Sequence, residues 1–448
     1  MTGALLQLAA YGAQDIYLTG NPQITFFQSV YRRYTNFAVQ NIRQSFYGNA
    51  DFGQKVYCQI EPIGDLINKM YLRIRLPSLK PFTYQDDTNT QVKFFWVNSI
   101  GHAIIKTIEV LIGDQLIDRQ YGVWLEIWGE LTVDASKRQG YFDMIGKSDN
   151  PVNLNNDDGQ DLYIPLQFWF NKTIGQSLPL IALQDHQVRI VVAFRDLQQL
   201  IVSSNGEPFS PKSICSKKPG VPDTLSITES YLDVDYIFLE DEERKKFAKQ
   251  NHQYLIEQVQ VYATQLTTKG QQFVNQPTDV CEGPGDRYSA ELFHRVILNF
   301  NHPMKELIWV FQNRNVLSLY PYGGNEWFNF STNSYQQYEV DGEDPMTRCK
   351  IVFEGKDRID YKDAKYFRTV LPYQYHTNTP NNFIYVFPFS NNPEAFQPSG
   401  SCNFSRIDDQ ELYINISPKL NEPMINVFGV NYNILNIAGG MAGLEYSS

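Results

Sequence analysis

A short, strongly charged segment just past the middle of the chain separates two long stretches of strand-like sequence. Before it, apolar or aromatic side chains occupy every second position from Leu232 to Phe238, as in a strand with one buried face. Four acidic residues, Glu240–Glu243, then precede the three bases of Arg244–Lys246. Acid before base suits the dipole of a short helix, and opposite charges four residues apart can pair on one helix face. Strand-like sequence resumes at Tyr254–Ala263, so the segment between is predicted to be a helix.

This helix has two interpretations: a connector between two β domains, or a surface helix inside a single domain. A chain of 448 residues exceeds one comfortable core and suits two domains of about 200 residues each. We therefore predict an N-terminal arm at 1–25, a first domain at 26–241, a connector helix at 242–252 and a second domain at 253–448. Glycines interrupt the arm, and a chain end is loose unless a partner holds it.

The first domain is predicted to consist mainly of short strands. In Asp65–Leu76, apolar residues alternate with polar and charged ones, which is typical of an antiparallel strand with one buried face. Gly113-Asp114 has the composition of a two-residue hairpin turn. Strands are expected at Thr35–Phe46, Lys55–Ile60, Asp65–Leu76, Lys106–Ile112, Gln115–Arg119, Leu162–Phe170, Leu178–Leu183, Gln187–Phe194 and Leu225–Leu239. Helical turns are expected at Phe26–Tyr34 and Trp124–Leu131, and surface loops at 147–161 and 203–223.

The second domain repeats this pattern. Strands are expected at Tyr254–Leu266, Leu292–Phe300, Glu306–Gln312, Ile351–Phe353, Phe367–Pro372, Phe383–Phe389, Glu411–Ile416 and Met424–Ile437, with a largely irregular stretch at 313–346. The 29 Phe, 28 Tyr, 23 Pro and 28 Gly favour short strands and many turns. Many short strands with few helices predict an all-β fold of two sandwiches.

Two short segments of the first half recur in the second at nearly the same offset. Leu162–Ile164 resembles Ile384–Val386, 222 residues later, and Asp185–Ile190 resembles Asp409–Ile414, 224 residues later. Both offsets are close to half of the chain. They indicate a duplicated β domain, although short strands also match by coincidence.

The composition argues against several classes of protein. The net charge is −11, the opposite of what a protein that grips a phosphate backbone needs, so no direct nucleic-acid binding is expected. The five cysteines are scattered and form no CxxC, which indicates a reducing compartment. They are Cys58, Cys215, Cys281, Cys349 and Cys402. The first residues make a poor signal peptide, and no apolar run approaches the roughly 18 residues of a membrane span.

No local pattern for an enzyme or a cofactor is present, so no catalytic, cofactor-binding or metal-binding residue is predicted. GxSxG is absent, and the paired carboxylates Asp408-Asp409 would point to opposite faces of a strand. Gly439–Gly443 is not a GxGxxG phosphate loop, and Arg32-Arg33 is more typical of a solvated or partner-facing pair than of a phosphate site.

Metal-ligand patterns are equally weak. The histidines, which form neither HxH nor HExxH, are His102, His186, His252, His294, His302 and His376. His294 and His302 could approach across strands, but packing roles are favoured. The loop that begins at Asn153 imitates the first ligands of a calcium loop with Asn153, Asn155 and Asp157; its glycine, Gly159, comes one place late, and its twelfth position is Ile164 instead of Glu.

Four sequons occur, at Asn171, Asn329, Asn403 and Asn415. Without a secretory signal they are expected to be unmodified by the host route.

Seven blocks in order along the chain resemble the major capsid proteins of nucleocytoplasmic large DNA viruses. The first is NPQITFFQSVYRRYTNFA at 21–38, and it is most similar to the chlorella-virus (phycodnavirus) type. The others are LPLIALQDHQVRI at 178–190, VDYIFLEDEERKKFA at 234–248, HQYLIEQVQ at 252–260, LNFNHPMKELIW at 298–309, QPSGSCNFSRID at 397–408 and NYNILNIAGGMAGL at 431–444. The resemblance thus extends over nearly the whole chain.

The resemblance implies two consecutive eight-stranded jelly rolls with a few short helices. It further implies a homotrimer with a pseudo-hexagonal outline that tiles an icosahedral shell in the virion, assembled in the host cytoplasm. Neighbouring capsomers, minor capsid proteins, a penton protein and an internal membrane side are the implied partners. Loops at 79–97, 143–161, 203–223, 264–290 and 313–347 depart most from the family pattern and would form the outer towers.

The competing interpretation is a two-domain jelly-roll protein that binds or processes carbohydrate. That protein would need a cleft with convergent carboxylates and aromatic side chains. A monomeric size would favour it, whereas a capsomer should be an oligomer.

Overall fold

The computed structural model describes residues 2–86, 89–148, 157–205, 209–218, 220–266, 292–313, 325–333, 342–420 and 423–446. The chain divides into two compact units, Met1–Phe37 and Ala38–Ser448. The first unit holds the helices α1 (Gly3–Ala9) and α2 (Ile16–Thr19), neither of which buries a residue. None of the helices in the described ranges is long and apolar enough to cross a bilayer.

The helical turns expected at Phe26–Tyr34 are absent, so that prediction was wrong. Aromatic and β-branched residues lose side-chain freedom in a helix, and this segment has no buried face to compensate for the loss. The helices of this unit form instead in the segments that are rich in Ala and Leu or that follow Asp15.

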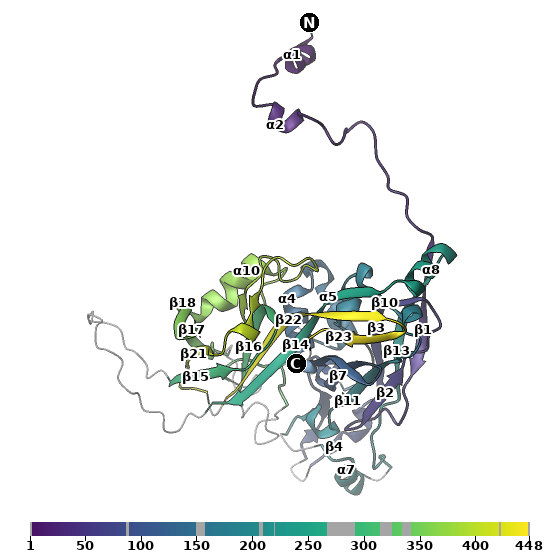
Figure 1. The fold of residues 1–448 in the computed structure, drawn as a ribbon. Coiled ribbons are helices and arrows are strands. Elements are labelled where there is room, and N and C mark those ends of the chain that lie inside the picture. The colour runs from purple at the N-terminus through teal and green to yellow at the C-terminus, as the bar shows by residue number, and fades with distance from the viewer. Residues whose placement is uncertain are drawn as a thin grey trace, which may run out of the picture. The chain divides into compact units, whose positions relative to one another are not determined.

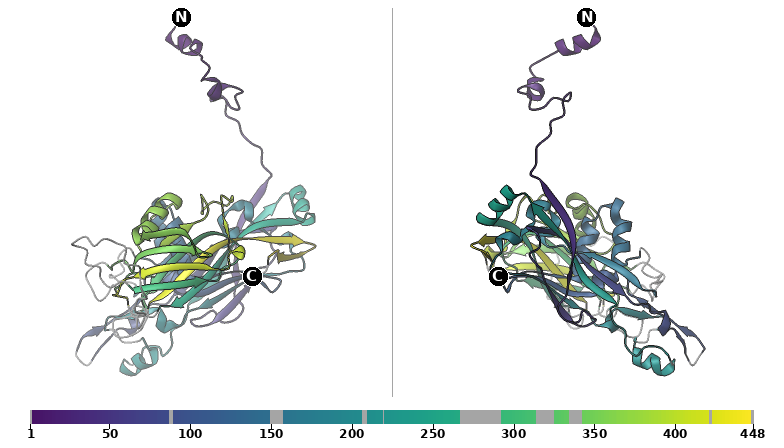
Figure 2. Two further views of the ribbon diagram at one scale, coloured as in Figure 1. Left: turned by 60° about the vertical axis from the view of Figure 1, so that its left-hand side comes forward. Right: turned by 90° about the vertical axis from the view of Figure 1, so that its right-hand side faces the viewer.

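The first half of the larger unit is a sandwich of two antiparallel sheets (Figures 1 and 2). One sheet, called sheet A, has the order β1-β13-β3-β10, with β9 also paired to β3. The other has the order β2-β11-β7-β8. The strands are β1 (Phe37–Ser45), β2 (Lys55–Gln59), β3 (Leu66–Leu76), β7 (Ile105–Ile112), β8 (Gln115–Tyr121), β9 (Gln160–Pro165), β10 (Leu178–Pro179), β11 (Val188–Phe194) and β13 (Glu229–Leu239).

The second half repeats this topology strand for strand. One sheet, called sheet E, has the order β14-β22-β16-β19, and the other has the order β15-β21-β17-β18. The strands are β14 (His252–Gln265), β15 (Leu292–Leu298), β16 (Pro303–Gln312), β17 (Met346–Phe353), β18 (Lys356–Asp363), β19 (Tyr385–Pro388), β21 (Gln410–Ile416) and β22 (Met424–Ala438), with β20 (Cys402–Asn403) and β23 (Met441–Leu444) added to sheet E. Each half is therefore an eight-stranded jelly roll, counting β9 and β10 as one position.

Short helices connect and decorate the two jelly rolls. They are α3 (Ile100–Ala103), α4 (Gly122–Thr132), α5 (Arg138–Ile145), α6 (Trp169–Lys172), α7 (Pro211–Lys217), α8 (Asp241–Lys249), the π-helical turn η6 (Tyr366–Val370), α10 (Leu371–Tyr375) and the 3-10 turns η3 (Ile174–Gln176) and η4 (Leu180–Ala182). The connector α8 carries Asp241, Glu242 and Glu243 in its first turn and Lys246 and Lys249 in its last, as the dipole favours. The strands before and after it belong to different sheets.

The same hairpin occurs at the same place in both jelly rolls. Gly113 and Asp114 between β7 and β8 both have positive φ, 55° and 66°, and so do Glu354 and Gly355 between β17 and β18, 49° and 70°. Two successive residues with positive φ make the type I′ turn that suits the twist of a hairpin. In each hairpin the pairing register then shifts at the third residue of the second strand. Topology and detail both indicate a duplicated domain.

Sheet E is apolar on both faces. In β16, Leu307, Trp309 and Phe311 belong to the core of the second jelly roll, whereas Ile308 and Val310 belong to a core that is continuous with the first. Tyr385 and Phe387 of β19 and Ile425 and Val427 of β22 likewise belong to the core of the second jelly roll, whereas Val386, Phe428 and Val430 belong to the continuous one. Because antiparallel sheets usually leave one face to water, this sheet depends on the first jelly roll to cover its outer face.

Several expected elements differ from the structure. Phe367–Pro372 was expected to be a strand but is helical, because Phe367 and Leu371 lie four apart and bury one helix side. The expected strand Leu162–Phe170 ends at Pro165, and Leu178–Leu183 becomes a 3-10 turn after two residues. The loop 203–223 contains α7, which is capped by the Ser210 hydroxyl. Neither β18 nor α5 was expected.

Parts of two expected loops pack against each other. Residues 79–97 contribute β4 (Tyr84–Gln85), β5 (Gln91–Val92) and β6 (Phe94–Trp96), and β6 pairs with β12 (Ile201–Ser203). The Phe209 ring meets the rings of Phe82 and Phe94 edge-on, with centroids 5.2 Å and 4.9 Å apart. This end of the first jelly roll thus has its own small aromatic core.

Trp124 on α4 tests how strongly the two jelly rolls depend on each other. Its ring is buried, and its centroid lies 5.6 Å from that of Phe428 on β22. We expect Trp124→Ala to lower the free energy of unfolding by about 3–5 kcal/mol, because it opens a cavity in the shared core. Urea unfolding followed by far-UV circular dichroism measures the change. Tyr446→Ala, at an exposed ring, is the control; equal effects of both substitutions would contradict a shared core.

Candidate functional site

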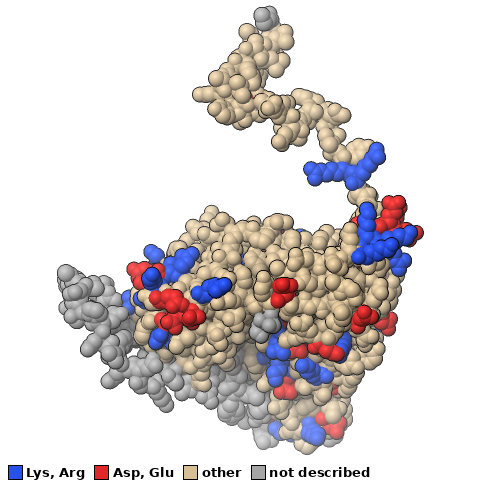
Figure 3. Space-filling view, viewed as in Figure 1, with Lys and Arg blue, Asp and Glu red and all other residues tan. Residues whose placement is uncertain are grey.

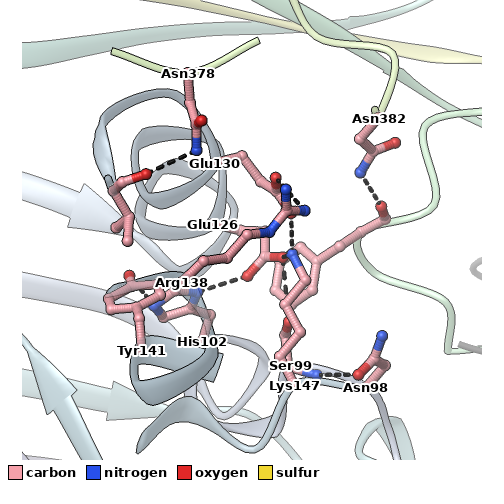
Figure 4. Close-up of polar contacts among 12 residues, drawn as sticks. Asn98, Ser99, His102, Glu126, Glu130, Arg138, Tyr141, Lys147, Asn378 and Asn382 are labelled. Atoms are coloured by element: carbon pink, nitrogen blue, oxygen red, sulfur yellow. Dashed lines mark hydrogen bonds and ion pairs between the residues drawn. The ribbon is translucent and has the colours of Figure 1, made fainter. Parts of the chain in front are cut away.

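The most concentrated group of buried charges lies where the two jelly rolls meet. A cavity of about 680 Å³ is lined by first-half residues around α4 and α5 and by second-half residues 325–329 and 381–383. Asn382 donates to the Phe328 carbonyl within the second half, and Asn378 crosses to the first half, where it donates to the carbonyls of Leu131 and Val133 (Figure 4).

Glu126 is the centre of this group. Its carboxylate lies 2.6 Å from His102 Nδ1 and 2.6 Å from Lys147 Nζ, and it accepts a hydrogen bond from Ser99 at 3.1 Å (Figure 4). The buried face of α4 presents Glu126 toward α3, which carries His102. The Tyr141 hydroxyl lies 3.1 Å from the other ring nitrogen of His102.

Glu130, one helical turn further along α4, continues the network. It pairs with Lys147 and lies 3.5 Å from the guanidinium of Arg138 on α5. Burial disfavours the charge of Glu126, but Lys147 and the hydrogen bond from His102 prevail and lower the pKa of Glu126 to about 2. Burial likewise opposes the charge of Lys147, but Glu126 and Glu130 raise its pKa.

These pairings decide what the site can do chemically. Each carboxylate has a cation within ion-pair distance, and the pKa of Glu126, about 2, lies far below the neutral range that suits a general base. In the described ranges, no three His, Cys, Asp or Glu side chains gather as a potential metal site. The network therefore fixes α3, α4 and α5 against one another beneath the second jelly roll.

A second charged contact crosses the junction directly. Lys172 on α6 of the first half lies 2.8 Å from Glu257 on β14, and Glu257 also pairs with the fully buried Lys305 on β16. Burial opposes ionisation of Glu257, but the two lysines lower its pKa. Nearby, Asp118 on β8 accepts a hydrogen bond from the Val259 amide at 3.1 Å. Polar groups of both halves thus satisfy each other at the junction.

His376 makes a third buried group, in the second half. Its Nε2 lies 3.1 Å from Glu306 and its Nδ1 lies 3.1 Å from Glu394. Burial disfavours the imidazolium, but the two carboxylates raise the pKa of His376 to about 9. His376 is therefore a cation at neutral pH that compensates the buried charge of Glu306.

The other candidate histidines do not come together. His294 lies in β15 and His302 precedes β16, and the described part of the chain records no hydrogen bond or ring contact between them. Both are buried, which lowers their pKa values. His186 accepts a hydrogen bond from the Ala442 amide at 3.1 Å.

The four sequon asparagines fall into two groups. Asn171, Asn329 and Asn415 are buried, and the side-chain amide of Asn171 donates to the Asn68 carbonyl at 2.6 Å. Asn403 is exposed, and only its oxygen is engaged, by the Ser405 amide. The three buried side chains serve the folded structure, so a sugar on a sequon of the folded chain is sterically feasible at Asn403 alone.

The remaining candidates have structural positions. Gly439 and Gly440 turn the chain between β22 and β23 with positive φ, and the Gly440 carbonyl accepts from Asp185 of the first half. Arg32 and Arg33 are exposed in the first unit. Asn153 and Asn155 of the calcium-like loop lie outside the described residues, as does Cys281, and the other four cysteines are free.

The charged network itself was not expected from the sequence. His102, Glu126 and Lys147 lie more than 20 residues apart in sequence and match no motif. The available signal was the pair Glu126 and Glu130 on a predicted helix whose apolar residues already demanded burial. Carboxylates on a face that must be buried require cations nearby.

Comparison with known proteins identifies both halves. A family model described as "Major capsid protein N-terminus" matches residues 25–240, and one described as "Large eukaryotic DNA virus major capsid protein" matches residues 243–443. The chain is 34% identical to the major capsid protein of Phaeocystis pouchetii virus, 35% to that of Pyramimonas orientalis virus and 33% to that of Paramecium bursaria Chlorella virus 1. Each match covers all of both chains.

Solved structures agree with the sequence matches. A chain of the quasi-atomic model of the PBCV-1 virus capsid superimposes with a TM-score of 0.71 at 27% identity, over 95% of this chain and all of that one. The Faustovirus major capsid protein gives a TM-score of 0.70 at 12% identity, over 97% of this chain and 96% of that one, which concerns the fold alone.

His376 makes the stability of the fold depend on pH. Because its pKa is raised from 6.5 to about 9 in the folded chain, its contribution is fully present below pH 6.5 and is lost as pH rises through about 9. The loss amounts to about 3 kcal/mol. Urea unfolding at pH 6, 8 and 10 measures it. The alkaline loss should shrink in His376→Gln and persist in the control His294→Gln; an unchanged loss in His376→Gln would refute this assignment.

Proposed function

This chain belongs to the family of large eukaryotic DNA virus major capsid proteins, and we propose that three copies of it form a capsomer with a pseudo-hexagonal outline. It is a structural protein of the virion and not an enzyme. The observation that carries the trimer is the duplication: two jelly rolls of one strand order in each chain. Three chains supply six such units, and closed threefold symmetry alternates the two kinds around a ring.

The domain division proposed for this function is an arm at 1–25, jelly rolls at 26–241 and 253–448, and a connector helix at 242–252. Two observations support it. The two family matches meet between residues 240 and 243, and α8 begins at Asp241. The first compact unit continues past the arm boundary, to Phe37.

The capsomers are proposed to associate with one another in the icosahedral shell, with assembly in the host cytoplasm. Minor capsid and penton proteins are the other proposed partners, with the membrane side beneath the shell. The net charge of −11 supports contacts with proteins over direct contacts with DNA. A carbohydrate-processing enzyme is not supported, because the relatives are capsid proteins and the buried carboxylates of the junction are paired.

The trimer is tested by the mass of the purified protein. A chain of 51.8 kDa predicts a species of three times that mass at micromolar concentration. Mass photometry and sedimentation velocity measure it directly. The Trp124→Ala variant, which loosens the shared core, shows how a folding defect by itself changes the measured mass. A wild-type protein that remains at 51.8 kDa at these concentrations would contradict the proposal.

The arm is proposed to act after the trimer has formed. Leu5, Leu6 and Leu8 are exposed and α1 buries nothing, so the arm has no core of its own. Ordering it costs roughly 1–2 kcal/mol per residue, which a partner beneath the capsomer would offset by covering these leucines. Deletion of residues 2–20 should leave trimers intact and impair shell assembly, as seen by electron microscopy of particles. Loss of trimers would place the arm in the trimer interface, and normal shells would make it dispensable.

A further inference from the structure

We propose that the β17–β18 hairpin with η6 and α10 of one copy docks on the outer face of sheet A in a second copy of this chain. This inference rests on the proposed trimer and identifies the surfaces that would join its subunits. It derives from a contact that already exists inside each chain. The two jelly rolls share one topology, so each surface of the contact between them has an equivalent on the other jelly roll. These two equivalent surfaces do not contact each other within the described part of the chain.

The contact inside the chain joins one edge of the first jelly roll to sheet E of the second. On the first jelly roll it uses β8, the second strand of the β7–β8 hairpin, and α4, the helix that follows. The Ile117 carbonyl, at the register shift of β8, accepts a hydrogen bond from the Gln258 side chain on β14. Asp118 accepts from the next amide of β14, and Trp124 on α4 meets Phe428 on β22.

The second jelly roll presents the equivalent elements to solvent. The hairpin β17–β18 has the same turn as β7–β8. Its register shift leaves Arg358 without a paired residue, as the shift in β7–β8 leaves Ile117. All of the β18 residues are exposed or half-buried. The helix that follows leaves Val370 37% and Tyr373 80% exposed, large apolar surfaces for a soluble helix end. In Figure 3, charged side chains gather around this end of the molecule.

The first jelly roll presents the equivalent of the covered sheet. The outer face of sheet A corresponds to the face of sheet E that the first jelly roll buries. It carries charged side chains where that face of sheet E carries apolar ones. Arg43 and Arg75 pair with Glu229, and Arg73 and Arg75 pair with Asp161. The edge strand β1 is almost entirely exposed. This face is therefore ordered by its own ion pairs, and most of its side chains are half-buried or exposed among the described residues.

The charges on the two surfaces favour contact between the outer face of sheet A and the β17–β18 hairpin with its helix. Asp233 and Asp235 on β13 belong to this outer face, and in the described part of the chain neither forms an ion pair. On the opposite surface, Lys362 and Lys365 are exposed and likewise form no ion pair within the described ranges. Acids outside ion pairs on one face and bases outside ion pairs on the other would attract each other in a second copy, in addition to the attraction that Arg43 and Arg73 exert on Asp233 within the chain.

The positions of the two surfaces favour a closed ring. Strands β1 and β18 lie at opposite ends of the body in Figures 1 and 2, so the two surfaces of one copy cannot contact each other. A contact between two different surfaces is head-to-tail, and it forms a ring when the rotation between copies closes. The same rotation that relates the two jelly rolls within a chain would then relate the second jelly roll to the first of the next chain.

Charge reversal on each surface tests the docking. The double variants Asp233→Lys/Asp235→Lys and Lys362→Glu/Lys365→Glu each place like charges across the contact and should raise the concentration at which trimers dissociate by at least about tenfold. The quadruple variant, which reverses both surfaces, should restore trimers. Lys245→Glu/Lys249→Glu on α8 is the matched control and should leave trimers unchanged. Mass photometry across a dilution series measures all four.

A single substitution guards against a folding defect in the double variants. Tyr373→Ala removes a ring that is 80% exposed, so it should weaken trimers and leave the urea unfolding of the dissociated chain unchanged. If wild-type protein is trimeric and every variant matches it, the docking surfaces are wrong while the trimer stands. The docking also fails if the quadruple variant does not recover trimers or if the control loses them. A monomeric wild-type protein would contradict the proposed trimer itself.

Discussion

The structure depends on a sheet whose central strands, β16 and β22, are buried on both faces. Sheet E supplies the core of the second jelly roll with one side and packs on the first jelly roll with the other. Burying an aliphatic or aromatic side chain contributes about 1.5–3 kcal/mol, so Ile308, Val310, Phe428 and Val430 alone bind the two halves strongly. A second jelly roll separated from the first would expose this face to water. The two halves are for this reason one compact unit, although each has a complete strand topology.

Burial at this junction explains where the charges lie. An ionised side chain next to an apolar face must be paired, because an isolated buried charge is far costlier than a paired one. Glu126 with Lys147, and Glu257 with Lys172 and Lys305, meet this requirement with partners from different elements. Removing one partner would leave the other buried and uncompensated.

The sequence predicted what depends on local pattern and missed what depends on contact. Strands with strict alternation, such as β3 and β11, were located to within about two residues, and the charged connector was identified as a helix. The strand β18 escaped because only Ile359 and Tyr361 alternate with its charged residues, and two half-buried positions are too short a pattern to detect. The helix at 366–375 escaped because a short apolar run does not distinguish a strand from a buried helix. Its counterpart α4 was predicted, and applying the duplication would have placed a helix here as well. The charged network at the junction has no local pattern at all, since its members meet only in the folded chain.

The duplicated halves differ on a face where their surroundings also differ. The outer face of sheet E is apolar and permanently covered by the first jelly roll, which the chain itself holds at high effective concentration. The outer face of sheet A has the same place in the topology but carries Arg43, Arg73, Arg75, Asp161 and Glu229. A free subunit must keep that face soluble before it meets a partner, and a charged face does so where an apolar one of the same size would aggregate. Polar contacts also discriminate between correct and incorrect partners, because a misaligned copy leaves charges unpaired. An apolar contact within the chain and the proposed charged contact between chains would therefore be one duplicated surface under two different requirements.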